Sequence, residues 1–231
     1  MSATPNAAPP MPPSPDPSET HTVVAALLKN PRWIAEAIAH RERLFGSALA
    51  LLVAGLASHA VFGVAIGLFG GWSIAAMDAV KAPLVGLGSL LLCFPSLYVF
   101  SCVAGAPLTL AQAFVLGCSC FAMVGLILVG LAPVAWLFAV STTSLAFVAM
   151  LAFLLWLVAI GFAARYVEKL RSSPLFQRQA GIKLWFLILM LVTLQMATCM
   201  RPMLAPSDNG WWTGQKQFFL SHFVLTLDGK N

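Results

Sequence analysis

Charge is almost absent from the middle of this chain. Between Arg43 and Arg165 only Asp78 and Lys81 carry a formal charge, in the stretch "MDAVKAPL". Of all 231 residues, 60% are hydrophobic and 9% are charged, whereas soluble domains have about 25% charged residues. A water-soluble fold of this size could not bury so many apolar side chains. We therefore expect the lipid bilayer to be the main solvent of this protein.

Apolar runs of spanning length predict an all-α integral membrane bundle. Five runs are long enough to cross the roughly 30 Å hydrocarbon core of a bilayer, so we predict about five transmembrane helices within residues 45–204. They cover residues 45–70, 82–104, 109–131, 144–165 and 182–204. Residues 132–143 are apolar but contain Pro133 and several hydroxyl groups. We interpret them as a tight connection or re-entrant segment, with a tilted sixth element as the alternative.

The segments that flank the predicted bundle differ in composition. Residues 1–20 are rich in Pro, Ser and Ala, which predicts a disordered tail rather than a cleaved signal peptide. Residues 21–44 are amphipathic, which predicts a helix in the headgroup region or a stem that shields the bundle. Residues 205–231 predict an aromatic-rich outer tail that forms an interfacial belt or a surface for a partner. Its aromatic residues include Trp211, Trp212, Phe218 and Phe219.

Basic residues predict the orientation in the membrane. Nine Lys and Arg residues fall on the N-terminal side and in the loop after the fourth span, against four on the opposite side. Cytoplasmic loops are enriched in Lys and Arg, so we expect a cytoplasmic N-terminus and an outside C-terminus in a bacterial inner membrane. The net charge of +5 therefore mostly reports which loops face the cytoplasm. We expect the lipid bilayer, and no nucleic acid, as a partner.

Small residues in the first two predicted spans indicate close helix packing. Absent side chains allow another helix backbone to approach, within the bundle or between copies. The predicted packing residues are Gly55, Gly63, Gly67, Gly71, Gly86 and Gly88. His59 lies among them. An ionisable residue within a span is a functional candidate, although a neutral histidine can also simply bond a serine or a backbone carbonyl.

Asp78 and Lys81 complete the set of candidate polar residues with His59. A spacing of three places their side chains on one helical turn, where they can pair. Because the second span is predicted to begin at residue 82, we expect the pair at the outer membrane boundary, with neither charge buried. There it would fix the depth of the second helix, with Pro83 at the helix start.

The sequence contains no recognisable set of catalytic or cofactor-binding residues. It has no H-E-x-x-H, G-x-S-x-G or P-loop motif. The five cysteines lie in apolar runs, where free cysteine behaves as a small hydrophobe, and we expect no metal site and no cofactor. We predict that the protein is not an enzyme. An intramembrane enzyme would need a second acid, base or metal ligand beside His59.

Roughly residues 30–223 resemble a known family. The stretch from residue 79 to residue 120 resembles the Yip-type (Yip/Yif-like) polytopic membrane proteins, and most closely an uncharacterised bacterial membrane family. The matching positions are Lys81, Pro83, Leu84, Pro95, Leu97, Tyr98, Phe100, Gly105, Leu110 and Gln112, with Arg201, Pro202, Phe218 and Phe219 near the C-terminus. The resemblance implies a bundle of five to six helices, a cytoplasmic N-terminal segment and no established enzymatic role.

These observations predict a non-enzymatic role. Our first hypothesis is an interaction, organising or accessory subunit of a membrane complex, with a membrane-protein partner or further copies of itself. The alternative is a channel or transporter for a small, weakly polar solute. That alternative requires polar side chains to converge on one path. The candidates are His59, Ser89, Ser96, Ser101, Thr193 and Gln195.

Overall fold

The computed structural model of the chain describes residues 20–29, 44–103, 108–170 and 181–200, and every regular element in them is helical. The elements are α1 (Thr20–Lys29), α3 (Leu44–Gly67), the 3₁₀ turn η1 (Leu68–Gly70), α4 (Trp72–Val103), α5 (Leu110–Ser141), α6 (Leu145–Leu170) and α7 (Ile182–Cys199). The predicted all-α class is confirmed for this part of the chain.

Four of these helices are long and apolar enough to cross a membrane: α3 extended by η1, α4, α5 and α6. At 1.5 Å per residue, the 32 residues of α4 and of α5 extend about 48 Å, well beyond a hydrocarbon core of roughly 30 Å. The 18 residues of α7 extend about 27 Å, so α7 is the shortest of the long helices. Four helices of membrane-spanning length and apolar composition are therefore confirmed, whereas their insertion in a membrane and the fifth span stay predictions.

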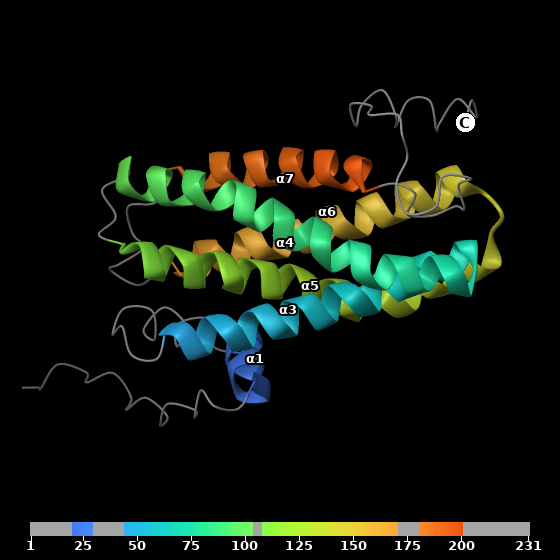
Figure 1. Cartoon of the computed structure of the whole chain (residues 1–231), viewed down its shortest axis with the longest axis horizontal. Helices are drawn as coiled ribbons and strands as arrows, with labels where there is room; N and C mark the ends of the chain where they lie inside the picture. The colour runs from blue at the N-terminus through green and yellow to red at the C-terminus, as the bar shows by residue number, and fades with distance from the viewer. Residues whose placement is uncertain (1–19, 30–43, 104–107, 171–180, 201–231) are drawn as a thin grey trace, which may run out of the picture.

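The long helices form an elongated bundle (Figure 1) in which α5 is the central element. α3 packs along α5 and α4, α6 packs on α5, and α7 packs chiefly on α4. Residues 115–122 of α5 are buried on all sides, among them Leu116, Cys118 and Ala122. α1 lies against α3 and α5, and its Val23 and Leu27 join the main apolar core.

Two predicted helix boundaries are wrong, and both errors arise at prolines. The second helix begins at Trp72 rather than at residue 82, with Pro83 in its interior, and α5 continues through Pro133 to Ser141. A proline removes one backbone hydrogen bond, but spanning helices accommodate this where neighbouring helices enclose the site. Ala132, Ala135 and Ala139 of α5 are buried. Residues 132–141 therefore belong to the packed bundle rather than to a connection.

Several predictions fall outside the described residues. These are the disordered tail, most of the amphipathic segment 21–44, and the whole of the outer tail 205–231. The aromatic residues Trp211, Trp212, Phe218 and Phe219 and the motif residues Gly105, Arg201 and Pro202 lie there as well.

Candidate functional site

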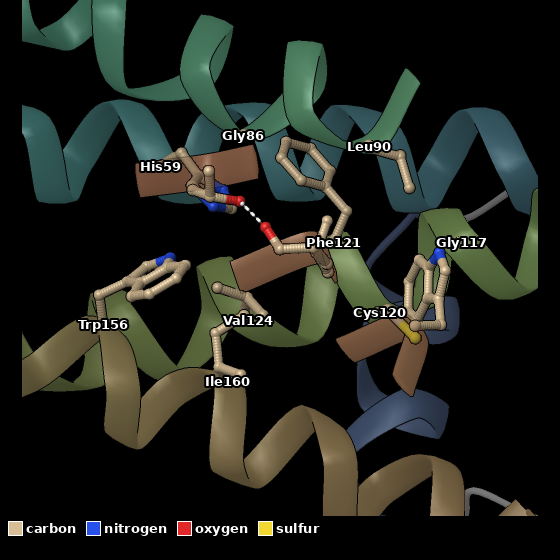
Figure 2. Close-up of a pocket in the computed structure, with 12 residues that line it drawn as sticks. His59, Gly86, Leu90, Gly117, Cys120, Phe121, Val124, Trp156 and Ile160 are labelled. Carbon is tan, nitrogen blue, oxygen red and sulfur yellow. Dashed lines mark hydrogen bonds between the residues drawn. The ribbon is translucent and has the colours of Figure 1, made fainter. Parts of the chain in front are cut away.

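A cavity of about 260 Å³ lies inside the bundle, between α3, α4, α5, α6 and α7. Its lining is mostly aliphatic and aromatic. Besides the Trp156 indole, the described lining includes three polar side chains. They belong to His59, Asp78 and Thr193. A smaller pocket of about 30 Å³ adjoins it and shares His59, Trp156 and Thr193 (Figure 2). The structure thus brings together three polar residues that are far apart in the sequence.

His59 of α3 is held by close packing on three sides. Its Nδ1 lies 2.8 Å from the carbonyl oxygen of Gly55, which can only accept, so Nδ1 donates and a neutral ring keeps Nε2 as an acceptor. The imidazole stacks on Phe121 of α5, with ring centroids 4.5 Å apart and an angle of 8° between the planes. A Cβ atom at Gly125 would lie 2.8 Å from Nδ1, and one at Gly86 would lie 3.2 Å from Nε2. Both glycines therefore make room for the ring.

Asp78 and Lys81 are buried inside the protein, each with 1% of its surface exposed. The prediction that neither charge is buried is therefore wrong. The first turns of α4 pack against the end of α3, so protein rather than water surrounds both side chains. The positive charge of Lys81 acts on the Asp78 carboxylate, yet Oδ1 of Asp78 has no hydrogen-bond partner in the described structure. Unlike Asp78, Lys81 does not line the cavity.

Glycines of α3 allow α4 to approach at the level of Asp78. A Cβ atom at Gly63 would overlap the carbonyl group of Asp78, and one at Gly67 would lie 3.0 Å from its Oδ2 atom. Gly71 differs from the prediction. It follows η1 with a φ of 93°, has nothing within 4 Å of an added Cβ, and donates its N–H to the carbonyl of Leu68. Gly71 is therefore a turn residue, because this conformation favours a residue without Cβ.

The other predicted packing glycines each face a different helix. Gly55 lies against Phe121 of α5, and Gly88 of α4 lies against the end of the Met196 side chain of α7. Together with Gly86, which faces His59 and Phe121, they bring α3, α4, α5 and α7 close around the cavity.

Asp78 and His59 lie at different levels of the cavity. His59 packs beside Gly86, which is eight residues beyond Asp78 on the same helix. Eight residues correspond to about 12 Å along an α-helix, well beyond hydrogen-bond distance. The two groups therefore form no direct acid–base pair, although they share one cavity.

The hydroxyl groups proposed for a polar path form hydrogen bonds within their own helices. Each donates to a backbone carbonyl three or four residues earlier. The bonds run from Ser89 to Val85 (2.7 Å), from Ser96 to Cys93 (2.7 Å), from Ser101 to Leu97 (2.8 Å) and from Thr193 to Leu189 (2.7 Å). Of these four, only Thr193 lines the cavity among the described residues. The hydroxyl groups therefore do not converge on one path.

The side of the cavity between α6 and α7 is the most loosely packed. α7 is anchored at its start, where the indole N–H of the fully buried Trp185 donates to the carbonyl of Cys93 at 3.0 Å. From residue 190 to residue 200 no residue is fully buried. α7 has far fewer contacts with α6 than with α4. The part of α7 that lines the cavity is therefore only loosely packed against α6.

Sequence reasoning missed part of the site. Phe121 stacks on His59 and Gly125 lies against its ring, while Phe121 and Trp156 line the smaller pocket (Figure 2). In the sequence all three are ordinary members of apolar runs. Of the motif residues, Pro83 and Pro95 lie within α4, and Gln112 forms a capping box with Thr109 at the start of α5. These motif positions shape helices rather than supply reactive groups.

Comparison of the chain with protein-family models, with curated proteins and with solved structures found no match. The Yip-type resemblance therefore stays a prediction.

Proposed function

We propose that this protein binds a small, weakly polar solute within the membrane and carries it across. One observation carries this proposal: a mostly apolar cavity of about 260 Å³ lies between five helices, and Asp78, whose enclosed Oδ1 has no hydrogen-bond partner, is among the residues that line it. Buried polar groups are normally bonded, because leaving one unsatisfied costs about 1–3 kcal/mol. An ionisable residue within a membrane bundle commonly marks a substrate pathway.

The size and chemistry of the cavity favour a carrier over a water-filled channel. An apolar cavity of about 150 Å³ is sufficient for benzene, so about 260 Å³ accommodates a molecule of one or two rings. Channels need a continuous polar or wide path, whereas the hydroxyl groups here bond within their own helices. A single binding site within the bundle that faces each side of the membrane alternately fits these features better.

Binding is tested with the purified full-length chain in lipid nanodiscs. A panel of small one-ring solutes is screened for an increase in unfolding temperature, in the wild type and in Ala152→Phe, whose larger ring fills the cavity from α6. We expect at least one solute to stabilise the wild type but not Ala152→Phe. If none stabilises the wild type, or if both proteins respond equally, the cavity is not a solute site. Transport of the binding solute is then measured in proteoliposomes.

The second candidate is the accessory or interaction subunit. The packing of His59 favours it, because its ring is fixed by Gly55, Phe121 and Gly125 as in a structural core. In this case the partner would be another membrane protein or a second copy of the chain. Crosslinking in native membranes followed by affinity purification tests it. Recovery of the chain as an isolated monomer would argue strongly against this role.

We also propose the orientation predicted from the sequence, in a bacterial inner membrane with a cytoplasmic N-terminus. Arg165 and Lys169 lie at the end of α6, and Lys183 lies at the start of α7. Lys183 is 4.0 Å from Glu168, so these cations share one end of the bundle. Basic residues collect on the cytoplasmic side. Labelling of single cysteines by a membrane-impermeant reagent tests the orientation.

A further inference from the structure

We infer that the cavity recognises a small lipophilic alcohol or phenol, whose hydroxyl group binds between His59 and Trp156 and whose apolar body fills the rest of the space. This inference rests on the proposed solute-binding function and names the class of solute. It combines an accessible acceptor on His59, a free donor on Trp156, and a lining that offers a ligand no exposed charge among the described residues.

The acceptor is Nε2 of His59. The side chain is buried, with 7% of its surface exposed, and Nδ1 donates to the Gly55 carbonyl, so the acceptor of the neutral ring is Nε2. Nε2 has no hydrogen-bond partner in the described structure, yet it is not among the fully enclosed unpartnered atoms there, which are Asp78 Oδ1 and Tyr166 Oη. It therefore keeps accessible surface.

This surface of Nε2 faces the cavity. His59 and Gly86 both line the cavity and the smaller pocket. A Cβ atom at Gly86 would lie 3.2 Å from Nε2, so Nε2 lies beside a position where the missing side chain leaves the ring edge uncovered. A ligand in the cavity can therefore reach this nitrogen.

The donor is the indole N–H of Trp156 on α6. Trp156 lines both pockets together with His59, and Figure 2 shows the indole and the imidazole on facing sides of the smaller one. The indole N–H of Trp185 donates to Cys93, whereas that of Trp156 bonds to no described residue and is not fully enclosed. An indole nitrogen only donates. The same space thus meets one free acceptor and one free donor.

A hydroxyl group satisfies both walls with a single oxygen atom. Its O–H donates to Nε2 of His59, and its lone pairs accept the indole N–H of Trp156. An ether or a ketone only accepts, so it leaves Nε2 without a donor, and a desolvated polar group without a partner weakens binding. Thr193 donates its own proton to the Leu189 carbonyl and can offer the solute only a further acceptor.

The rest of the lining favours a neutral, apolar body. Asp78, the acidic side chain in the described lining, exposes 1% of its surface, and its unpartnered oxygen is enclosed. A charged ligand would therefore find no accessible countercharge there, and an unpaired buried charge is costly. Phe62, Ile66 and Phe153 line the cavity of about 260 Å³, and an apolar cavity of about 150 Å³ is sufficient for benzene. One ring with a short hydroxyl-bearing chain fits this space.

The test uses three probes with the same number of non-hydrogen atoms. 2-Phenylethanol donates and accepts, its isomer benzyl methyl ether only accepts, and n-propylbenzene does neither. Each is titrated into the full-length chain in nanodiscs, and bound probe is quantified by equilibrium dialysis against empty nanodiscs of the same lipid. We expect the wild type to bind the alcohol at least about fivefold more tightly than the ether, because one additional hydrogen bond contributes about this much.

Two variants locate the hydroxyl group. His59→Leu removes the acceptor and should bind the alcohol and the ether equally, while it still binds n-propylbenzene. Ser89→Ala is the matched control: it removes a buried hydroxyl that bonds to Val85 outside the lining, so it should keep the wild-type preference. A preference that persists in His59→Leu would overturn the inference.

The wild type alone also decides the inference, even if His59→Leu folds poorly. Equal affinity of the wild type for the alcohol and the ether would overturn the hydroxyl inference and leave solute binding intact, as expected if a fixed water molecule already bonds to Nε2. No binding of any of the three probes would overturn the inference together with the proposed solute-binding function.

Discussion

Gly63→Ala tests whether the close approach of α3 and α4 holds the bundle together. The added Cβ would lie 2.8 Å from the Asp78 carbonyl carbon and 2.9 Å from the Cβ of Ala82, and it would overlap the carbonyl oxygen itself. Unstrained carbon atoms lie about 3.5–4.0 Å apart, so the two helices must separate by roughly 1 Å. The backbone of α4 cannot rotate aside as a flexible side chain would.

The expected net effect is a loss of about 1–2 kcal/mol in the free energy of unfolding. Overpacking costs about 1–3 kcal/mol, and contact with backbone places this site in the upper part of that range. Replacing Gly with Ala inside a helix stabilises the helix by about 1 kcal/mol, because Ala has the higher helix propensity. Gly46→Ala is the matched control on the same helix, because nothing lies within 4 Å of its added Cβ. This control should be neutral or stabilising by up to about 1 kcal/mol.

Both variants are measured by reversible unfolding in mixed micelles, in which increasing amounts of a denaturing detergent are added and helix content is followed by circular dichroism. The two changes should differ by about 1–3 kcal/mol, from the values above. Equal stability of Gly63→Ala and Gly46→Ala would refute the proposed tight contact. So would a stabilised Gly63→Ala.

Three further predictions use the same unfolding assay. Gly125→Ala should be about 1–3 kcal/mol less stable than the open-position control Gly46→Ala, because its Cβ would displace the imidazole of His59; equal stability of the two variants would contradict this. Trp185→Phe, which loses the bond to the Cys93 carbonyl, should cost about 0.5–1.5 kcal/mol, whereas Trp136→Phe, at a half-exposed position, should cost less. Asp78→Leu and Lys81→Met should each destabilise, and the double variant by about 0.5–3 kcal/mol less than their sum. Additive effects would show that the two side chains are not coupled.

The burial of Asp78 and Lys81 shows the limit of reasoning from sequence. Hydropathy predicts that these charges avoid the lipid, and it therefore placed them outside the second span. In the structure, neighbouring helices shield the two charges instead. α4 continues past both residues, and they are enclosed between helices, where Gly63 and Gly67 leave space. Which of the two solutions applies depends on the neighbouring helix, and a hydropathy window along one segment does not include that neighbour.

The candidate site was likewise only partly predictable from the sequence. His59 was identifiable as an exceptional residue in an apolar helix, and the small residues around it were identifiable as a packing stripe. Its stacking on Phe121, its contact with Gly125 and its place on a cavity shared with Asp78 and Thr193 were not identifiable. Those features require residues of four helices to meet, and their sequence separations carry no local periodic signal.

The sequence by itself determined the fold class of this protein, which is an all-α chain with helices of membrane-spanning length. Long apolar runs must satisfy their backbone hydrogen bonds internally in a lipid environment, so they form helices of spanning length. The tertiary structure decided where those helices begin and end, which glycines pack and which one turns, and which polar side chains face a common space. Helix formation is a local property of each segment, whereas a cavity exists only between segments, and its shape follows from how their side chains interlock.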